Sequence, residues 1–153
     1  MEEKPKEIVI PKEDAVFWLD KNGIWHNENG KFQHKKIIDY FHACIAKDQD
    51  GFYLTQERDN IREKVYFPYE ETAYFVFEVI KEKEITLVLN TKKQIKLKPK
   101  SLFIKNDSLY MSIGDDCIKF SEHALVKISD MLEYEKDRYF IRVKHRRYEI
   151  KKV

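Results

Sequence analysis

The sequence is poor in the residues that build several common functional sites. It contains four glycines, widely separated, and this spacing excludes a glycine-rich phosphate-binding loop. Its two cysteines, Cys44 and Cys117, stand in apolar stretches without a C-x-x-C pair, which indicates reduced core thiols. No apolar run approaches the roughly 20 residues of a membrane-spanning helix, and the charged N-terminus has no signal-peptide pattern. We therefore expect a cytoplasmic protein.

The composition is that of a folded globular chain. Of the 153 residues, 42% are hydrophobic and 14% aromatic, too many for disorder, whereas the 37% that are charged are too many for a membrane protein. The net charge of +2 is unevenly distributed, because residues 1–91 carry 13 basic and 18 acidic side chains and residues 92–153 carry 16 and 9. This asymmetry indicates either an anionic partner for the basic half or two parts that attract each other.

Apolar periodicity predicts a series of short elements that occurs twice. Residues 17–25 read as a hairpin, residues 37–45 as a helix with one apolar stripe, and residues 52–56 and 61–67 as strands. Short matches at offsets of 85, 88 and 87 residues predict a second hairpin, a second helix with Ser121 as its N-cap, and a further hairpin. Between the two series, residues 74–80 and 85–89 predict a central hairpin.

These elements predict an α+β fold of two related hairpin-helix-hairpin motifs, an internal repeat, with antiparallel sheets each packed on one helix. The predicted parts are a charged leader (1–14), the first motif (15–73), a central hairpin and connecting strand (74–100) and the second motif (101–153).

The stretch AKDQDGFYLTQE, residues 46–57, has part of the spacing of an EF-hand calcium loop. Carboxylates occupy loop positions 3 and 5, glycine position 6 and glutamate position 12. However, Ala46 stands at position 1, no amphipathic helix follows, and the second motif lacks the acidic spacing. We therefore predict a helix end closed by Gly51, with Asp48 and Asp50 in solvent. His34 and His42 do not have a zinc spacing, so we expect no metal and no cofactor.

The C-terminal residues 138–153 carry seven basic side chains, one acidic side chain and three aromatic rings. Such a mixture can bind phosphate backbones and stack bases. The candidate nucleic-acid residues are Arg142, Lys144, Arg146 and Arg147. Because apolar and charged residues alternate here, we favour the solvated face of a terminal hairpin.

Several short motifs together resemble a bacterial protein family. They are DKNGIWH (20–26), Ile37-Ile38, Phe41, DGFYL (50–54), EKV (63–65) and ETAYF (71–75). Over residues 16–98 the sequence resembles the domain-of-unknown-function 1285 family. The resemblance implies an α+β fold of repeated hairpin-helix motifs and a role in ligand binding and signal transduction, without an established activity. Thr72 to Phe75 lacks the proline expected before the phenylalanine, and the second half is unusually basic.

We predict a non-catalytic bacterial module that binds a small molecule or a protein partner between its two motifs, with a role in signal transduction. The candidate ligand-binding residues are aromatic or acidic and lie mostly in the matching segments: Trp25, Tyr53, Glu63, Tyr66, Glu71 and Tyr74. One alternative is a nucleic-acid-binding protein that uses the basic C-terminal half. Two others are an enzyme of unrecognised class and an interaction module without a small ligand. No residue is predicted to be catalytic.

Overall fold

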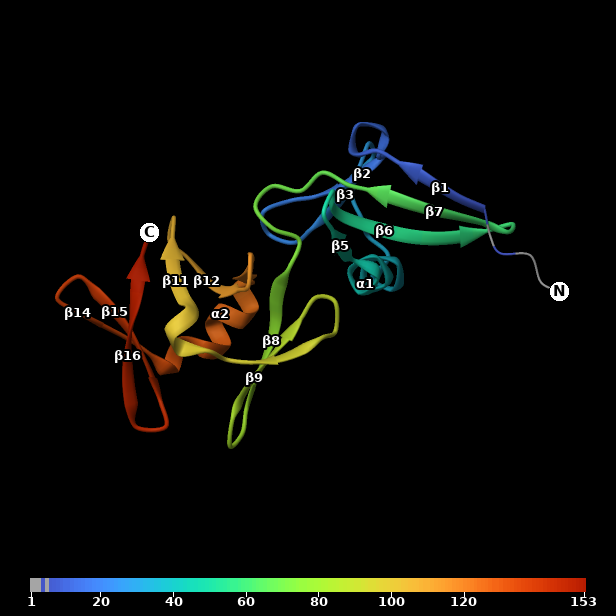
Figure 1. Ribbon diagram of the computed structural model, residues 1–153. Helices are drawn as coiled ribbons and strands as arrows, with labels where there is room; N and C mark the ends of the chain where they lie inside the picture. Colours follow the sequence, from blue (N-terminus) through green and yellow to red (C-terminus); the bar gives the residue numbers. More distant parts are fainter. Residues whose placement is uncertain (1–3, 5) are drawn as a thin grey trace. The chain divides into compact units, whose positions relative to one another are not determined.

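The computed structural model describes residues 4 and 6–153, and the chain divides into two compact units, residues 1–73 and 74–153 (Figure 1). Residues 1–3 and 5 of the predicted leader lie outside the described residues. The remainder of that leader contains a strand and a short 3₁₀ helix. No helix in the described part of the chain combines the length and the apolar content needed to cross a bilayer.

The first unit is built from a four-stranded and a three-stranded sheet with one α-helix. Its elements are β1 (Lys6–Ile10), η1 (Lys12–Asp14), β2 (Phe17–Leu19), β3 (Trp25–Asn27), β4 (Gly30–Lys31), α1 (Lys35–Cys44), β5 (Ala46–Asp48), β6 (Gly51–Arg58) and β7 (Ile61–Tyr66). The larger sheet has the order β1-β7-β6-β5, with β1 parallel to β7 and the other pairs antiparallel. The smaller sheet is the antiparallel series β2-β3-β4.

Aromatic rings form the core of the first unit. Trp25 of β3 is 1% exposed, and its ring meets those of Phe67 and Phe41 edge to face, at centroid distances of 4.9 and 5.4 Å. Phe17 of β2 contacts the Phe41 ring at 5.1 Å. Large rings in such geometry stabilise a core through both buried area and ring contacts. These contacts therefore join the small sheet, α1 and the end of β7.

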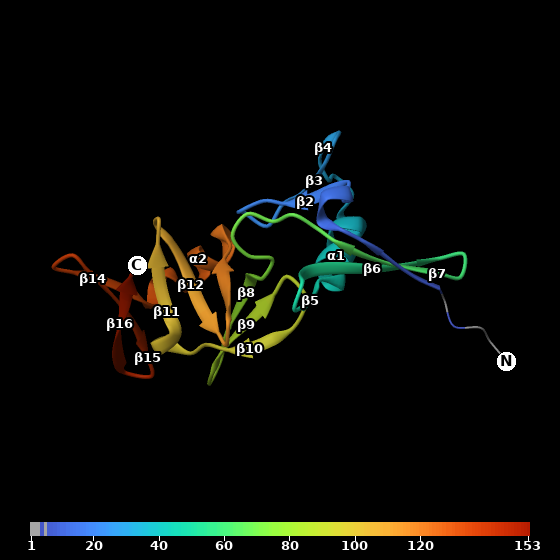
Figure 2. The same cartoon turned by 45° about the horizontal axis from the view of Figure 1, so that its top comes forward.

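The second unit is dominated by one mixed sheet of nine strands. Its elements are β8 (Phe75–Lys81), β9 (Ile85–Leu89), β10 (Gln94–Lys96), η2 (Pro99–Ser101), β11 (Leu102–Lys105), β12 (Ser108–Ile113), β13 (Asp116–Phe120), α2 (Glu122–Ile128), η3 (Ser129–Met131), β14 (Leu132–Glu135), β15 (Arg138–Val143) and β16 (Arg146–Lys152). The strand order is β10-β9-β8-β13-β12-β11-β16-β15-β14, and the pairs β13–β8 and β11–β16 are parallel (Figure 2).

Helix α2 covers an aliphatic core on the nine-stranded sheet. Ala124 and Ile128 are 0% exposed and belong to one buried cluster with strand residues such as Met111, Ile118 and Ile141. The prediction of Ser121 as the N-cap is confirmed, because its Oγ accepts a hydrogen bond from the Ala124 N–H at 3.2 Å. This bond satisfies one backbone donor that the helix start leaves free.

The predicted fold class is wrong. The described residues are mostly in strands, with two α-helices of 10 and 7 residues, in place of two hairpin-helix-hairpin repeats whose sheets each pack on one helix. The reason is that a hairpin leaves two open edges, and their N–H and C=O groups need partners. Here, strands distant in sequence supply them, including β8 for β13 and β16 for β11.

The predicted helix end at Gly51 is also wrong. Helix α1 ends at Cys44, and the following residues form the β5–β6 hairpin, in which Asp48 is paired with Gly51. Gly51 has φ +125°, a conformation that favours glycine over other residues. Asp48 is not a solvated helix-end residue but a member of the larger sheet.

Candidate functional site

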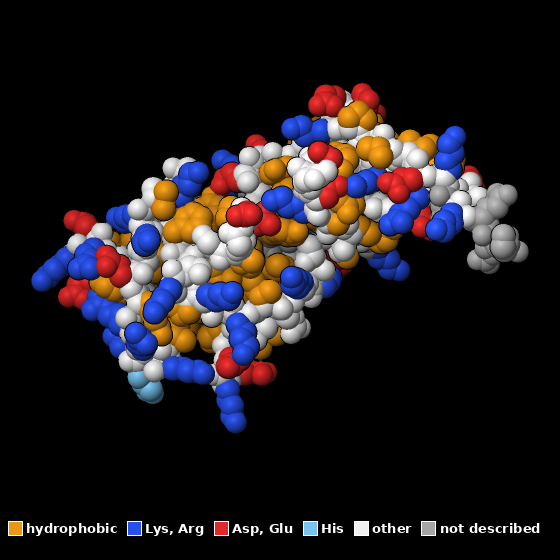
Figure 3. Space-filling model, in the orientation of Figure 1, with side chains coloured by type: hydrophobic (Ala, Val, Ile, Leu, Met, Phe, Trp, Pro, Cys, Tyr) orange, Lys and Arg blue, Asp and Glu red, His pale blue; other side chains and the backbone are white. Residues whose placement is uncertain are grey.

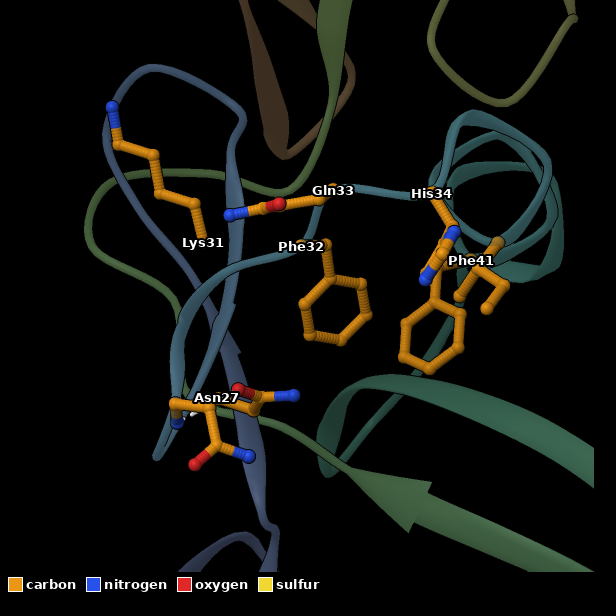
Figure 4. A pocket seen from close by; sticks show the side chains of 8 residues that line it. Asn27, Lys31, Phe32, Gln33, His34 and Phe41 are labelled. Carbon is orange, nitrogen blue, oxygen red and sulfur yellow. Dashed lines mark hydrogen bonds between the residues drawn. The ribbon is translucent and has the colours of Figure 1, made fainter.

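A hollow of about 380 Å³ opens in the first unit between the small sheet and α1 (Figure 4). This volume lies within the range of small-molecule sites. The lining residues come from β3, β4, the turn between them, the segment before α1, and α1 itself: Asn27, Asn29, Lys31, Phe32, Gln33, His34, Ile37 and Phe41.

Two aromatic rings form the apolar part of the hollow. Phe32 and Phe41 meet edge to face at 5.0 Å, and their rings lie next to each other near the centre of Figure 4. Both also contact Trp25, at 6.4 and 5.4 Å, and the Phe32 N–H donates to the Trp25 carbonyl at 3.0 Å. The buried tryptophan therefore supports the rings from the core. Ile37 adds an apolar side chain that is 46% exposed.

The rim of the hollow is polar and contains no carboxylate. Asn27, Asn29 and Gln33 contribute amides, and the Asn27 Oδ1 accepts the Asn29 N–H at 2.9 Å. Lys31 and His34 lie on opposite sides of the rings, so they do not converge on one point (Figure 4). Rings surrounded by amides, an ammonium group and an imidazole can bind a molecule that has an apolar or planar part and an anionic or hydrogen-bond-accepting group.

The structure places the six predicted ligand-binding residues in different environments. Tyr53 and Tyr66 lie together on the four-stranded sheet, with ring centroids 5.6 Å apart. Glu63 is on β7 with the opposite strand parity to Tyr66, and Glu71 is exposed beyond that strand. Tyr74 begins the second unit. The sixth, Trp25, is a core residue, and its Nε1 has no hydrogen-bond partner among the described residues.

The two tyrosines belong to a charged cluster that the sequence did not reveal. Lys64 Nζ lies 4.3 Å from the Tyr53 ring centroid and 2.5 Å from Asp48 Oδ2. Tyr66 donates its hydroxyl proton to the same Asp48 oxygen at 2.6 Å. The hydrogen bonds from Lys64 and then Tyr66 lower the pKa of Asp48 to about 2, while Asp48 raises the pKa of Lys64 and of Tyr66.

These pKa shifts favour a structural role for the cluster. A catalytic lysine needs a lowered pKa so that its amine is free to attack or to take a proton. Here the ion pair keeps the Lys64 ammonium protonated, and the tyrosine hydroxyl holds its proton more tightly than usual. The cluster therefore binds β5 to β7 through side chains.

Replacing Asp48 by asparagine is expected to change the acid unfolding of the protein. Because the Asp48 pKa is lower in the folded than in the unfolded state, its ion pair favours folding above the usual aspartate range. This contribution is lost as the pH falls from about 4 toward about 2. Urea unfolding midpoints measured over this range should fall less steeply for Asp48→Asn than for the wild type. Asp115→Asn, an exposed turn residue in the second unit, should follow the wild type, and equal slopes for all three would contradict the assignment.

The candidate nucleic-acid residues lie in the β15–β16 hairpin, where acidic partners already bind two of them. Arg142 makes two hydrogen bonds to Glu133, at 3.1 and 3.3 Å, and Arg147 donates to Glu135 at 2.7 Å. Arg146 lies over the Tyr148 ring at 5.1 Å, and Lys144 is in the turn. Basic and acidic side chains are interleaved over this part of the second unit (Figure 3). Nucleic-acid binding stays a prediction.

Sequence patterns gave no signal for the hollow itself. The apolar stripe predicted for residues 37–45 includes Ile37 and Phe41, and His34 was considered only as a zinc ligand and rejected, yet these side chains meet at one opening. The one signal for this opening is that the apolar side chain of Ile37 is exposed, and this exposure can be seen only in the folded structure. Among residues 4 and 6–153, no three His, Cys, Asp or Glu side chains are grouped in a way that could hold a metal ion.

Two solved structures share this fold. A domain-of-unknown-function 1285 (DUF1285) family protein from Silicibacter pomeroyi matches 95% of this chain and 83% of its own, with a TM-score of 0.62 and 10% identity. A second member of that family, from Shewanella baltica, matches 78% of this chain and 94% of its own, with a TM-score of 0.53 and 12% identity.

Comparison with family models gives no match, and neither does comparison with curated proteins. The two solved structures confirm, at the level of the fold, the resemblance to the DUF1285 family that the sequence motifs indicated.

Proposed function

We propose that this chain is a non-catalytic binding module for a small molecule, and that the ligand occupies the hollow between the small sheet and α1. The observation that carries the proposal is the pairing of Phe32 and Phe41 inside a rim that contributes amides, the Lys31 ammonium group and the His34 imidazole but no carboxylate. The ligand combines a planar or apolar part with an anionic group. A cytoplasmic role in bacterial signal transduction, in which ligand binding alters contact with a protein partner, is part of the same proposal.

The chemistry of the titratable groups supports binding over catalysis. Lys31 and His34 stand on opposite sides of the hollow, whereas general acid–base catalysis needs groups within reach of one reacting atom (Figure 4). In the cluster of Asp48, Lys64 and Tyr66, a lowered pKa keeps the aspartate ionised, and raised pKa values keep the lysine and the tyrosine protonated.

A thermal-shift screen tests the proposal, and Ile37→Glu identifies the site. Nucleotides, amino acids and aromatic carboxylates should include compounds that raise the Tm, because a ligand at about 100 times its Kd stabilises the native state by about 2.7 kcal/mol. Glutamate at position 37 places a negative charge in the hollow, so the shift caused by an anionic ligand should disappear. Ile37 is half-exposed on the first turn of α1, so the fold should tolerate the change.

Val126→Glu is the matched control, because it adds the same charge at an α2 position that is 73% exposed. It should leave the ligand shift unchanged. The absence of any stabilising compound, or an equal shift in Ile37→Glu and the wild type, would contradict the proposal. Binding of mixed oligonucleotides at low salt, lost at high salt, would instead favour the nucleic-acid alternative.

A further inference from the structure

A second hollow in the first unit, of about 400 Å³, has the opposite charge character. It lies where β1 leads into η1, beside the end of β7 and the start of β6. Its lining includes the carboxylates Glu13 and Asp50, the ammonium group of Lys12, and the rings of Phe52, Tyr66 and Tyr69. Two acids against one base give the lining a net negative charge.

Two of the four aromatic rings in this hollow already contact ammonium groups within the fold. Lys47 Nζ lies 5.3 Å from the centroid of Phe52, and Lys64 Nζ lies 5.3 Å from that of Tyr66. Such distances are those at which a ring attracts a cation. Both rings therefore have an internal cation, supplied by β5 and β7.

Neither Phe67 nor Tyr69, the other two rings of this lining, has a cation over it among the described residues, and of these two only Tyr69 is open to solvent, since Phe67 is 1% exposed. Tyr69 is 38% exposed and contacts Phe52 edge to face at 4.9 Å. The carboxylates of Glu13 and Asp50 likewise form no ion pair with any described residue. The exposed ring and the two unpaired carboxylates lie at one opening, and a bound cation would interact favourably with all three.

We propose that this hollow binds a small organic cation, an alkylammonium or quaternary ammonium group, over Tyr69 and beside Asp50 and Glu13. A quaternary ammonium suits the site because it loses little hydration on meeting a ring, while the carboxylates supply long-range attraction. Lys12 opposes the bound charge and so limits the affinity. This site is separate from the hollow at Phe32 and Phe41, and the two proposals can fail independently.

The test is an NMR titration of the ¹⁵N-labelled full chain with choline at low ionic strength. The Gly51 amide, which lies in the lining, should shift and give a Kd. The neutral tert-butyl analogue of choline, in which carbon replaces the nitrogen, should not bind. Asp50→Asn combined with Glu13→Gln should weaken choline binding about tenfold, and Tyr69→Leu should have a similar effect. Lys12→Gln should tighten it.

Asp115→Asn, which removes an exposed carboxylate from the second unit, should leave the choline Kd unchanged. The carboxylate variants lie at exposed positions, so they test the proposal even where Tyr69→Leu disturbs the packing on Phe52. The proposal is overturned by any of three results: no shift at Gly51, equal binding of the neutral analogue, or an unchanged Kd in the double variant.

Discussion

Replacing Phe67 by alanine is expected to lower the free energy of unfolding by about 3–5 kcal/mol, the usual cost of emptying a large aromatic site in a core. Phe67 is 1% exposed, and its ring contacts those of Trp25 at 4.9 Å and Phe17 at 6.1 Å. Its loss leaves a cavity between the small sheet and the end of β7. Urea unfolding followed by tryptophan fluorescence measures the effect, because Trp25 stays in place as a buried reporter.

Tyr40→Ala provides the control within the same unit. Tyr40 lies on α1 and is 54% exposed, so its truncation should change the free energy of unfolding by less than about 1 kcal/mol. If Phe67→Ala were as mild as Tyr40→Ala, the aromatic cluster would not be the core of this unit.

Replacing Ile128 by alanine is expected to cost about 2–5 kcal/mol in the second unit. Ile128 is 0% exposed at the end of α2 and belongs to the aliphatic cluster of the nine-stranded sheet. Removing its side chain leaves a void against strands that cannot collapse without breaking their ladder hydrogen bonds. Urea unfolding followed by circular dichroism gives the size of the loss.

Val126→Ala tests the same helix two residues earlier. Val126 is 73% exposed, and alanine is the better helix former, so this change should be neutral or slightly stabilising. Equal losses at positions 126 and 128 would mean that α2 does not present Ile128 to the sheet.

Local elements could be predicted from the sequence because their signals are local. The apolar stripe around Phe41 predicted the helix that the structure contains as α1, and the Ser121 hydroxyl predicted the start of α2. The central hairpin predicted over residues 74–89 is present as β8 and β9. In each case, periodicity or a capping residue depends on neighbours within a few positions.

The sheets could not be predicted because their pairing is not local. Nothing in the sequence of Lys6 to Ile10 indicates a parallel partner more than 50 residues away, yet β1 pairs with β7. The nine-stranded sheet likewise joins the central hairpin to β13 through β8. Open strand edges are satisfied by whichever strand the whole chain brings near, and hydrophobic patterns do not specify that choice. For this reason the predicted α+β repeat was wrong.

The candidate site was partly hidden for the same reason. Tyr53 and Tyr66 were chosen for their chemistry, and the β6–β7 register does bring them together. Their partner Asp48 was not among the predicted site residues, because it was assigned to a helix end. Lys64 was not among them either. The hollow at Phe32 depends on where the chain turns after β4, which no residue pattern specifies.

We propose that the Phe32 and Phe41 hollow binds a small anionic molecule with a planar part. The most direct test is chemical-shift mapping of the ¹⁵N-labelled full chain with phenylacetate, and with benzylamine as a cation that carries the same ring. Phenylacetate should shift the backbone amides of residues 31–34 and 37, and benzylamine should leave them in place. Shifts from both compounds alike, shifts confined to other segments, or no shift with phenylacetate would contradict binding of such a molecule in this hollow.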